Sequence, residues 1–360
     1  QRGEDLTINS VYYFSKFDTV TLETAFTLKA INSKPQSQET SKENNASLQT
    51  PIIFDTALDY RILQLDDNAL KDENIYELPN YDNLKRLRFS LPEVKSGNLI
   101  MYSSVIEREY PENEYPFFIK QIFNADEPIL KSDIIVDIPQ NLIIDFDISD
   151  TNKIKFIENK ENNRRRLLFT AENISTNQLE EQRPPLEDIN PVLIVSKNKK
   201  INEALASIAI NIDTAYKNNK NILAAFENKY FLNTNKSNKL EYLKEIYNFF
   251  TKNFQTFSIP PNHNTYKFLE LSKISETMIA SEYDMIFFLT AFLKYLGYSA
   301  DFVLVKSADT GNQLYTKPFY LQQFNSAVCR VKLNNEIYYL LPNSPIAVFN
   351  TLPAVLHNAA

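Results

Sequence analysis

The hydrophobic pattern of the first half of the chain predicts β-strands. Residues 20–31 (VTLETAFTLKAI) alternate apolar and polar positions, as a strand with one buried face does. Residues 153–171 (KIKFIENKENNRRRLLFTA) predict a hairpin with an Asn-rich turn. Many short strands in succession favour an antiparallel β-sandwich. The other apolar runs of this kind are residues 86–92, 98–109, 117–123, 132–139 and 141–148.

Two polar features interrupt this pattern. Residues 33–50 (SKPQSQETSKENNASLQT) contain almost no large apolar residue, which predicts a flexible surface loop. The triplet Arg164, Arg165 and Arg166 would suit an anion, but a solvated strand end is the simpler interpretation.

From about residue 200 the apolar residues recur at helical spacing. Residues 201–218 predict a helix, and residues 222–230 and 240–254 predict two more. Residues 280–296 are apolar on nearly every side, which predicts a buried helix that ends at Gly297.

A strand is expected after Gly297, followed by two strands at residues 324–333 and 336–341 with a tight turn between them. The fold class is therefore α+β with two domains. An antiparallel β-sandwich is expected in residues 1–198 and an α+β domain in residues 199–360.

The composition excludes several classes of function. Only 4 glycines occur in 360 residues, and no glycine-rich phosphate-binding motif is present. The net charge of −7 argues against a nucleic-acid partner, which needs a basic face. No apolar run is long enough to cross a bilayer, which predicts no transmembrane segment. The chain begins with Gln1, so we expect a mature form from which any signal peptide has been removed.

The sequence contains few cysteine and histidine residues that could take part in catalysis or metal binding. Cys329 is the single cysteine, which excludes an internal disulfide and a multi-cysteine metal site, and we interpret it as a small buried residue. His263 lies in a proline-flanked loop and His357 lies near the last residue, so we expect neither to be catalytic. We therefore expect no metal and no cofactor.

The predicted buried helix begins with the cluster Ser281, Glu282 and Asp284. Ser281 and Asp284 fit a capping box, in which side chains satisfy backbone N–H groups of the first turn. The two carboxylates also compensate the helix dipole, an effect of some tenths of a kcal/mol to about one. Residues i and i+2 diverge by roughly 200° around a helix, which disfavours a metal or acid–base site shared by Glu282 and Asp284.

Three stretches together resemble a known bacterial architecture. Residues 280–305 (ASEYDMIFFLTAFLKYLGYSADFVLV) resemble the transglutaminase-like pattern Gly-Asp-Cys-Lys-Asp, a leucine-rich helix, Gly and a strand. Residues 324–343 (FNSAVCRVKLNNEIYYLLPN) resemble that family's Phe-Asn-His strand, turn and Leu-Asp-Pro-Thr strand. Segments between residues 84 and 196 are similar to the β-rich domain of unknown function that precedes such domains. The resemblance implies a papain-like fold in the second domain and a periplasmic or secreted location.

The catalytic residues implied by this resemblance are replaced in this chain. Glu282 stands in the place of the cysteine nucleophile, Ser326 in that of the histidine and Leu341 in that of the aspartate, while Asp284 is retained. A carboxylate is a feeble acyl nucleophile and serine cannot replace imidazole as a base. We therefore expect a pseudoenzyme that binds a peptide or protein partner in the bacterial cell envelope. Its binding site would contain the four residues named above.

Two other functions remain open. The first is an active hydrolase or acyltransferase with a non-standard constellation near Glu282, which needs a nucleophile within about 3 Å of a base at the start of the helix. The second is an assembly subunit whose N-terminal strands pair with a partner.

Overall fold

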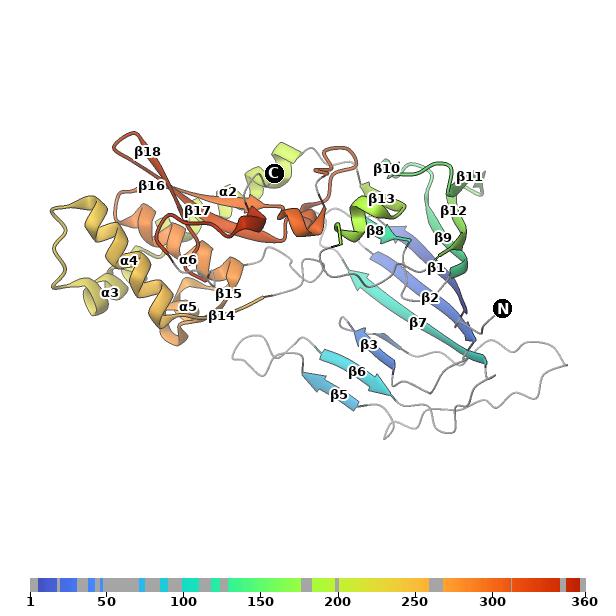
Figure 1. Ribbon diagram of the computed structural model, residues 1–360, viewed down its shortest axis with the longest axis horizontal. Coiled ribbons are helices and arrows are strands. Elements are labelled where there is room, and N and C mark those ends of the chain that lie inside the picture. Colours follow the sequence, from blue (N-terminus) through green and yellow to red (C-terminus); the bar gives the residue numbers. More distant parts are fainter. Residues whose placement is uncertain are drawn as a thin grey trace, which may run out of the picture. The chain divides into compact units, whose positions relative to one another are not determined.

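A computed structural model places most of the second half of the chain and the principal strands of the first half (Figure 1). It describes residues 118–123, 129–175, 183–197, 208–258, 268–311, 313–343 and 348–356 in full. It describes residues 6–17, 20–30, 38–42, 46–47, 71–74, 85–89, 99–109 and most of 201–207 by their backbone. The chain divides into two compact units, Gln1–Asn198 and Lys199–Ala360.

The largest sheet of the first unit has seven strands in the order β11-β12-β9-β1-β2-β7-β4. Neighbouring strands are antiparallel except for β1 and β9, which run parallel. The expectation of a purely antiparallel sandwich is therefore wrong for this pair, because residue alternation fixes which face is buried but not strand direction. The strands are β1 (Leu6–Phe17), β2 (Val20–Ala30), β4 (Ala46–Ser47), β7 (Leu99–Glu109), β9 (Ile129–Pro139), β11 (Ile154–Glu161) and β12 (Arg164–Ile174).

A second, three-stranded sheet covers one face of this sheet. Its order is β10-β13-β8, with β10 (Ile144–Ile148), β13 (Val192–Lys197) and β8 (Phe118–Ile122). Apolar residues of β9, β11 and β12 pack against those of β8, β10 and β13 in one continuous core. A short helix, α1 (Leu186–Ile189), precedes β13, and β3 (Gln38–Lys42), β6 (Lys85–Phe89) and β5 (Lys71–Asn74) form a further sheet.

The strand patterns of the first half are largely confirmed, and the polar loop is not. The predicted hairpin is β11 and β12, and its turn residues Asn162 and Asn163 both have positive φ, at 51° and 59°, as a tight hairpin turn requires. Residues 33–50 were expected to form a loop, but they include β3 and β4. The backbone of β3 pairs with β6 and that of β4 pairs with β7, so these polar residues form strands through partners elsewhere in the chain.

The arginine triplet of β12 is paired with carboxylates. Arg164 Nε lies 2.5 Å from Asp137 Oδ1, and an Arg166 guanidinium nitrogen lies 3.0 Å from Asp137 Oδ2. Arg165 donates to Glu158, which lowers the pKa of that carboxyl group. All three arginines of the triplet are therefore paired with carboxylates of neighbouring strands. This pairing argues against an anion-binding site at the triplet.

The second unit combines five helices with two small sheets in its described residues. The helices are α2 (Ile201–Asn218), α3 (Lys220–Phe231), α4 (Lys239–Asn253), α5 (Leu271–Thr277) and α6 (Glu282–Tyr295). Strands β16 (Ser299–Val305), β17 (Ser326–Leu333) and β18 (Glu336–Leu340) form one antiparallel sheet. Strands β14 (Gln255–Phe257) and β15 (Ile279–Ser281) form a parallel pair. The α+β class is thereby confirmed.

Helix α6 is the central element of the second unit. Every residue from Tyr283 to Leu293 is buried, because α2, β16 and β17 pack against the helix and aromatic side chains of α3 and α4 contact it as well. The helix ends as predicted, with Gly297 at a left-handed φ of 82°. The turn between β17 and β18 also has its expected left-handed asparagines, Asn334 and Asn335, at φ 52° and 65°.

Candidate functional site

The first residue of α6, Glu282, is paired with a serine from a neighbouring strand. Strands β14 and β15 run parallel with Phe257 opposite Ser281, so the residues that follow each of them, Ser258 and Glu282, come side by side. The Ser258 hydroxyl donates a hydrogen bond to the Glu282 carboxylate, with Oγ and Oε1 2.6 Å apart. Ser258 is exposed and Glu282 is half-buried, so the pair is accessible to a substrate.

Asp284 has a structural role in the same turn. Its backbone N–H donates to Ser281 Oγ at 3.1 Å, and the Ser281 hydroxyl donates in turn to Asp284 Oδ2 at 2.6 Å. The other carboxylate oxygen accepts the backbone N–H of Leu269 at 2.9 Å. Asp284 is 5% exposed. Ser281 therefore caps α6 as predicted, and Asp284 fixes Ser281 and the segment before α5 to the start of α6, while Glu282 is directed to Ser258.

The start of β17 is held against the first turn of α6. The Tyr283 hydroxyl donates to the backbone carbonyl of Phe324 at 3.0 Å, and both residues are buried. Ser326 follows two residues later, half-buried, as the first residue of β17 opposite Val305. This contact brings the strand that carries Ser326 to the end of α6 that carries Glu282.

Leu341, a residue of the candidate site predicted from the sequence, is a packing residue. It follows β18, is 5% exposed, and its carbonyl accepts the Tyr247 hydroxyl of α4 at 3.4 Å. The convergence of Glu282, Ser326 and Leu341 on one cleft stays a prediction.

The other sequence candidates are either inert or outside the described residues. Cys329 is fully buried as predicted, and burial raises the pKa of its thiol to about 12. His263 and His357 lie outside the described residues. Within the part of the chain that the structure describes, no three His, Cys, Asp or Glu side chains gather as metal ligands would. Among the described residues, no helix is both long enough and apolar enough to cross a membrane.

The arrangement at the start of α6 has the components of acyl-transfer chemistry. A serine hydroxyl within hydrogen-bond distance of a carboxylate is a nucleophile next to a base. Backbone N–H groups of the first turn of α6 lie in the same place, where the carboxylates of Glu282 and Asp284 compensate the helix dipole. The condition set above for an active site near Glu282 is therefore met by Ser258.

Sequence reasoning missed Ser258 entirely. It lies 24 positions before Glu282, in the loop sequence SIPPNHNTY, where no periodicity or motif marks it. The parallel pairing of β14 with β15 brings the two residues together. A pair of three-residue strands leaves no recognisable pattern in the sequence.

Comparison with known proteins shows a similar fold in one solved structure. No family model matches the chain, and no curated protein matches it. The crystal structure of a protein from Parabacteroides distasonis, described as a "putative protease", matches with a TM-score of 0.75 at 15% identity, over 95% of this chain and 68% of that one. An M1 zinc metallopeptidase from Deinococcus radiodurans matches with a TM-score of 0.26 at 10% identity, over 53% of this chain and 40% of that one. So low a TM-score supports no inference.

The expectation of a pseudoenzyme is contradicted by this comparison. The Parabacteroides protein, whose fold matches 95% of this chain, is described as a "putative protease". The expectation was based on the replaced cysteine, histidine and aspartate. It did not consider Ser258, which the structure places beside Glu282. Neither matched structure bears the transglutaminase-like name, so that resemblance stays a prediction.

Proposed function

We propose that the protein is a hydrolase that cleaves acyl bonds in peptides, with Ser258 as nucleophile and Glu282 as general base. The observation that carries this proposal is the 2.6 Å hydrogen bond from Ser258 Oγ to Glu282 Oε1 at the N-terminus of α6. The similarity of fold to a protein described as a protease supports a peptide as the acyl substrate.

The proposed reaction follows from the geometry of this pair. Ser258 Oγ attacks the acyl carbon while its proton passes to Glu282, and backbone N–H groups of the first turn of α6 stabilise the negative charge on the carbonyl oxygen. Glu282 then gives this proton to the leaving amine as the carbon–nitrogen bond breaks, which leaves an acyl ester on Ser258. Glu282 next takes a proton from water as the water oxygen attacks the acyl carbon. The carbon–oxygen bond to Ser258 then breaks, the carboxylic acid leaves, and Glu282 returns the proton to Ser258 Oγ.

The transglutaminase-like resemblance gives this proposal its framework. On this resemblance Glu282, Ser326 and Leu341 would occupy the positions of the family's triad, so the site at the start of α6 would have kept its position while its nucleophile changed. In this arrangement the nucleophile is the residue that follows β14, and Ser326 at the start of β17 contacts the bound peptide. A periplasmic or secreted location, which the resemblance implies, would supply peptides of the cell envelope as substrates.

Turnover of a library of internally quenched peptides tests the proposal. Ser258→Ala and Glu282→Gln should each reduce kcat/KM by about a hundredfold or more, because each removes one partner of the proton transfer. Ser237→Ala is a control on an exposed serine, and Glu241→Gln changes an exposed glutamate in the first turn of α4. Equal turnover by all four variants, or no turnover by the wild-type protein, would contradict the proposal.

A further inference from the structure

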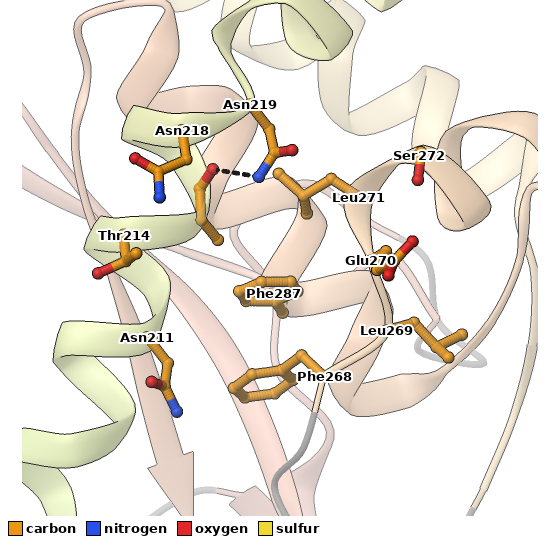
Figure 2. A pocket seen from close by; sticks show the side chains of 11 residues that line it. Asn211, Thr214, Asn218, Asn219, Phe268, Leu269, Glu270, Leu271, Ser272 and Phe287 are labelled. Carbon is orange, nitrogen blue, oxygen red and sulfur yellow. Dashed lines mark hydrogen bonds between the residues drawn. The ribbon is translucent and has the colours of Figure 1, made fainter.

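A cavity of about 490 Å³ lies between α2, the segment before α5 and α6 in the second unit (Figure 2). Its size is within the range of about 300–1,000 Å³ that is typical of small-molecule sites. The site proposed for catalysis does not include it, since Ser258 and Glu282 are not among the described residues that line it.

One wall of the cavity consists of amide and hydroxyl groups from a single helix face. Asn211, Thr214 and Asn218 are separated by three and four residues on α2, which places them on the same side of the helix. Figure 2 shows them along α2, with the rings of Phe268 and Phe287 between this helix and the segment that carries Leu269 and Glu270. All three polar residues are exposed, so their hydrogen-bonding groups are accessible from solvent.

An aromatic pair lies between the two walls. The rings of Phe268 and Phe287 are stacked, with centroids 4.3 Å apart and planes inclined by 7° (Figure 2). Phe302 contacts Phe268 edge-on at 5.4 Å, and Phe287 is buried. One face of the half-buried Phe268 ring is therefore covered by Phe287, and the orientation of the ring is fixed by its neighbours.

The second wall is anchored to the helix that carries Glu282. The backbone N–H of Leu269 donates to Asp284 Oδ1 at 2.9 Å, so this segment is tied to the first turn of α6. On the other side, the Asn219 amide group donates to the Ala215 carbonyl at 2.8 Å, which leaves its oxygen as the acceptor. These bonds hold both walls in place before a ligand binds.

The chemistry of the lining selects among ligands. Glu270 is the one ionisable side chain among the described lining residues, which include no Lys, Arg or His, so an anionic ligand would be repelled. A purely apolar ligand would leave the amides of α2 without partners. A hydroxyl group both donates and accepts, and so does an asparagine amide.

We propose that this cavity binds a neutral sugar residue. The apolar C–H face of a pyranose ring packs on Phe268, and its hydroxyl groups form hydrogen bonds with Asn211, Thr214 and Asn218. A peptide is the competing ligand, and the experiment below distinguishes the two. Sugar binding here does not depend on hydrolysis at Ser258.

Ligand-observed NMR with N-acetylglucosamine, methyl glucoside and methyl galactoside tests this proposal on the full chain. At least one of them should bind with Kd on the order of 1 mM or tighter. Asn211→Ala should weaken binding by about three- to tenfold, since it removes one hydrogen-bonding side chain. Asn228→Ala, an exposed asparagine on α3 outside the cavity, is the matched control and should leave Kd unchanged.

Two further variants keep the result interpretable. Phe268→Leu retains apolar volume beneath the ligand but removes the flat ring, and it should also weaken binding. Ser258→Ala should bind the sugar as the wild type does, which separates this site from catalysis. The proposal is overturned if none of the three sugars binds, if Asn211→Ala and Asn228→Ala bind equally, or if trialanine binds in their place.

Discussion

Ser258 Oγ and Glu282 Oε1 lie 2.6 Å apart at the ends of two parallel strands. The relationship depends on the register of β14 and β15, in which Phe257 is opposite Ser281. The turn from α5 into β15 contains Met278 in the left-handed conformation, with φ 53°, which directs the chain into this register. The candidate nucleophile is therefore positioned by a small element that lies outside the central helix.

Asp284→Asn should destabilise the second unit. The carboxylate accepts hydrogen bonds from the Ser281 hydroxyl and the Leu269 N–H in a buried position, and an amide can replace only part of this acceptor capacity. We expect the free energy of unfolding to fall by about 1–3 kcal/mol, measured by urea denaturation. Glu276→Gln, at an exposed position on α5, should change it by less than about 0.5 kcal/mol. Equal stability of the two variants would contradict the structural role of Asp284.

Cys329 should be unreactive in the folded protein. The thiol is buried, and burial raises its pKa to about 12, so very little thiolate is present near neutral pH. A thiol-specific chromogenic reagent at about pH 8 should react with Cys329 only after urea unfolds the protein. Rapid stoichiometric reaction of the native protein would show that β17 is accessible from solvent.

Tyr298 should make the protein less stable at alkaline pH. Burial raises the pKa of its hydroxyl to about 12, and this hydroxyl donates to the Lys239 carbonyl at 2.8 Å. Between the unfolded pKa near 10 and the folded pKa near 12 the native state binds more protons than the unfolded state, so stability falls as pH rises through this interval.

Replacing this hydroxyl tests the assignment. Urea denaturation at several pH values should show a weaker loss of stability above about pH 10 for Tyr298→Phe than for the wild type. An equal loss of stability in both proteins would show that other groups cause the alkaline effect. Buried Tyr242 is one such group, since burial also raises the pKa of its hydroxyl.

Regular elements with long patterns could be predicted from the sequence. The burial of α6 was predicted from its apolar sequence, and its two ends were predicted from Ser281 and Gly297. The hairpin of β11 and β12 was predicted because its asparagine turn lies between two alternating runs. In these cases a local pattern of residues is itself the physical cause of the structure.

Features that depend on distant pairing could not be predicted. The parallel direction of β1 and β9 and the order of β3 and β4 within a polar segment both arise from partners elsewhere in the chain. The same holds for the candidate site, because Ser258 acquires its partner only through β15. The transglutaminase-like resemblance directed attention to Glu282, Ser326 and Leu341. It gave no reason to consider Ser258, which follows a different strand.

Covalent labelling of Ser258 is the most direct test of the central claim. A fluorophosphonate reacts with serine hydroxyl groups that a neighbouring base activates, and peptide mapping by mass spectrometry locates the adduct. We predict an adduct on Ser258 in the wild-type protein, with labelling strongly reduced in Glu282→Gln and unchanged in Glu241→Gln. Labelling of Ser258 that is equal in Glu282→Gln and wild type, or peptide hydrolysis that persists in Ser258→Ala, would contradict the account.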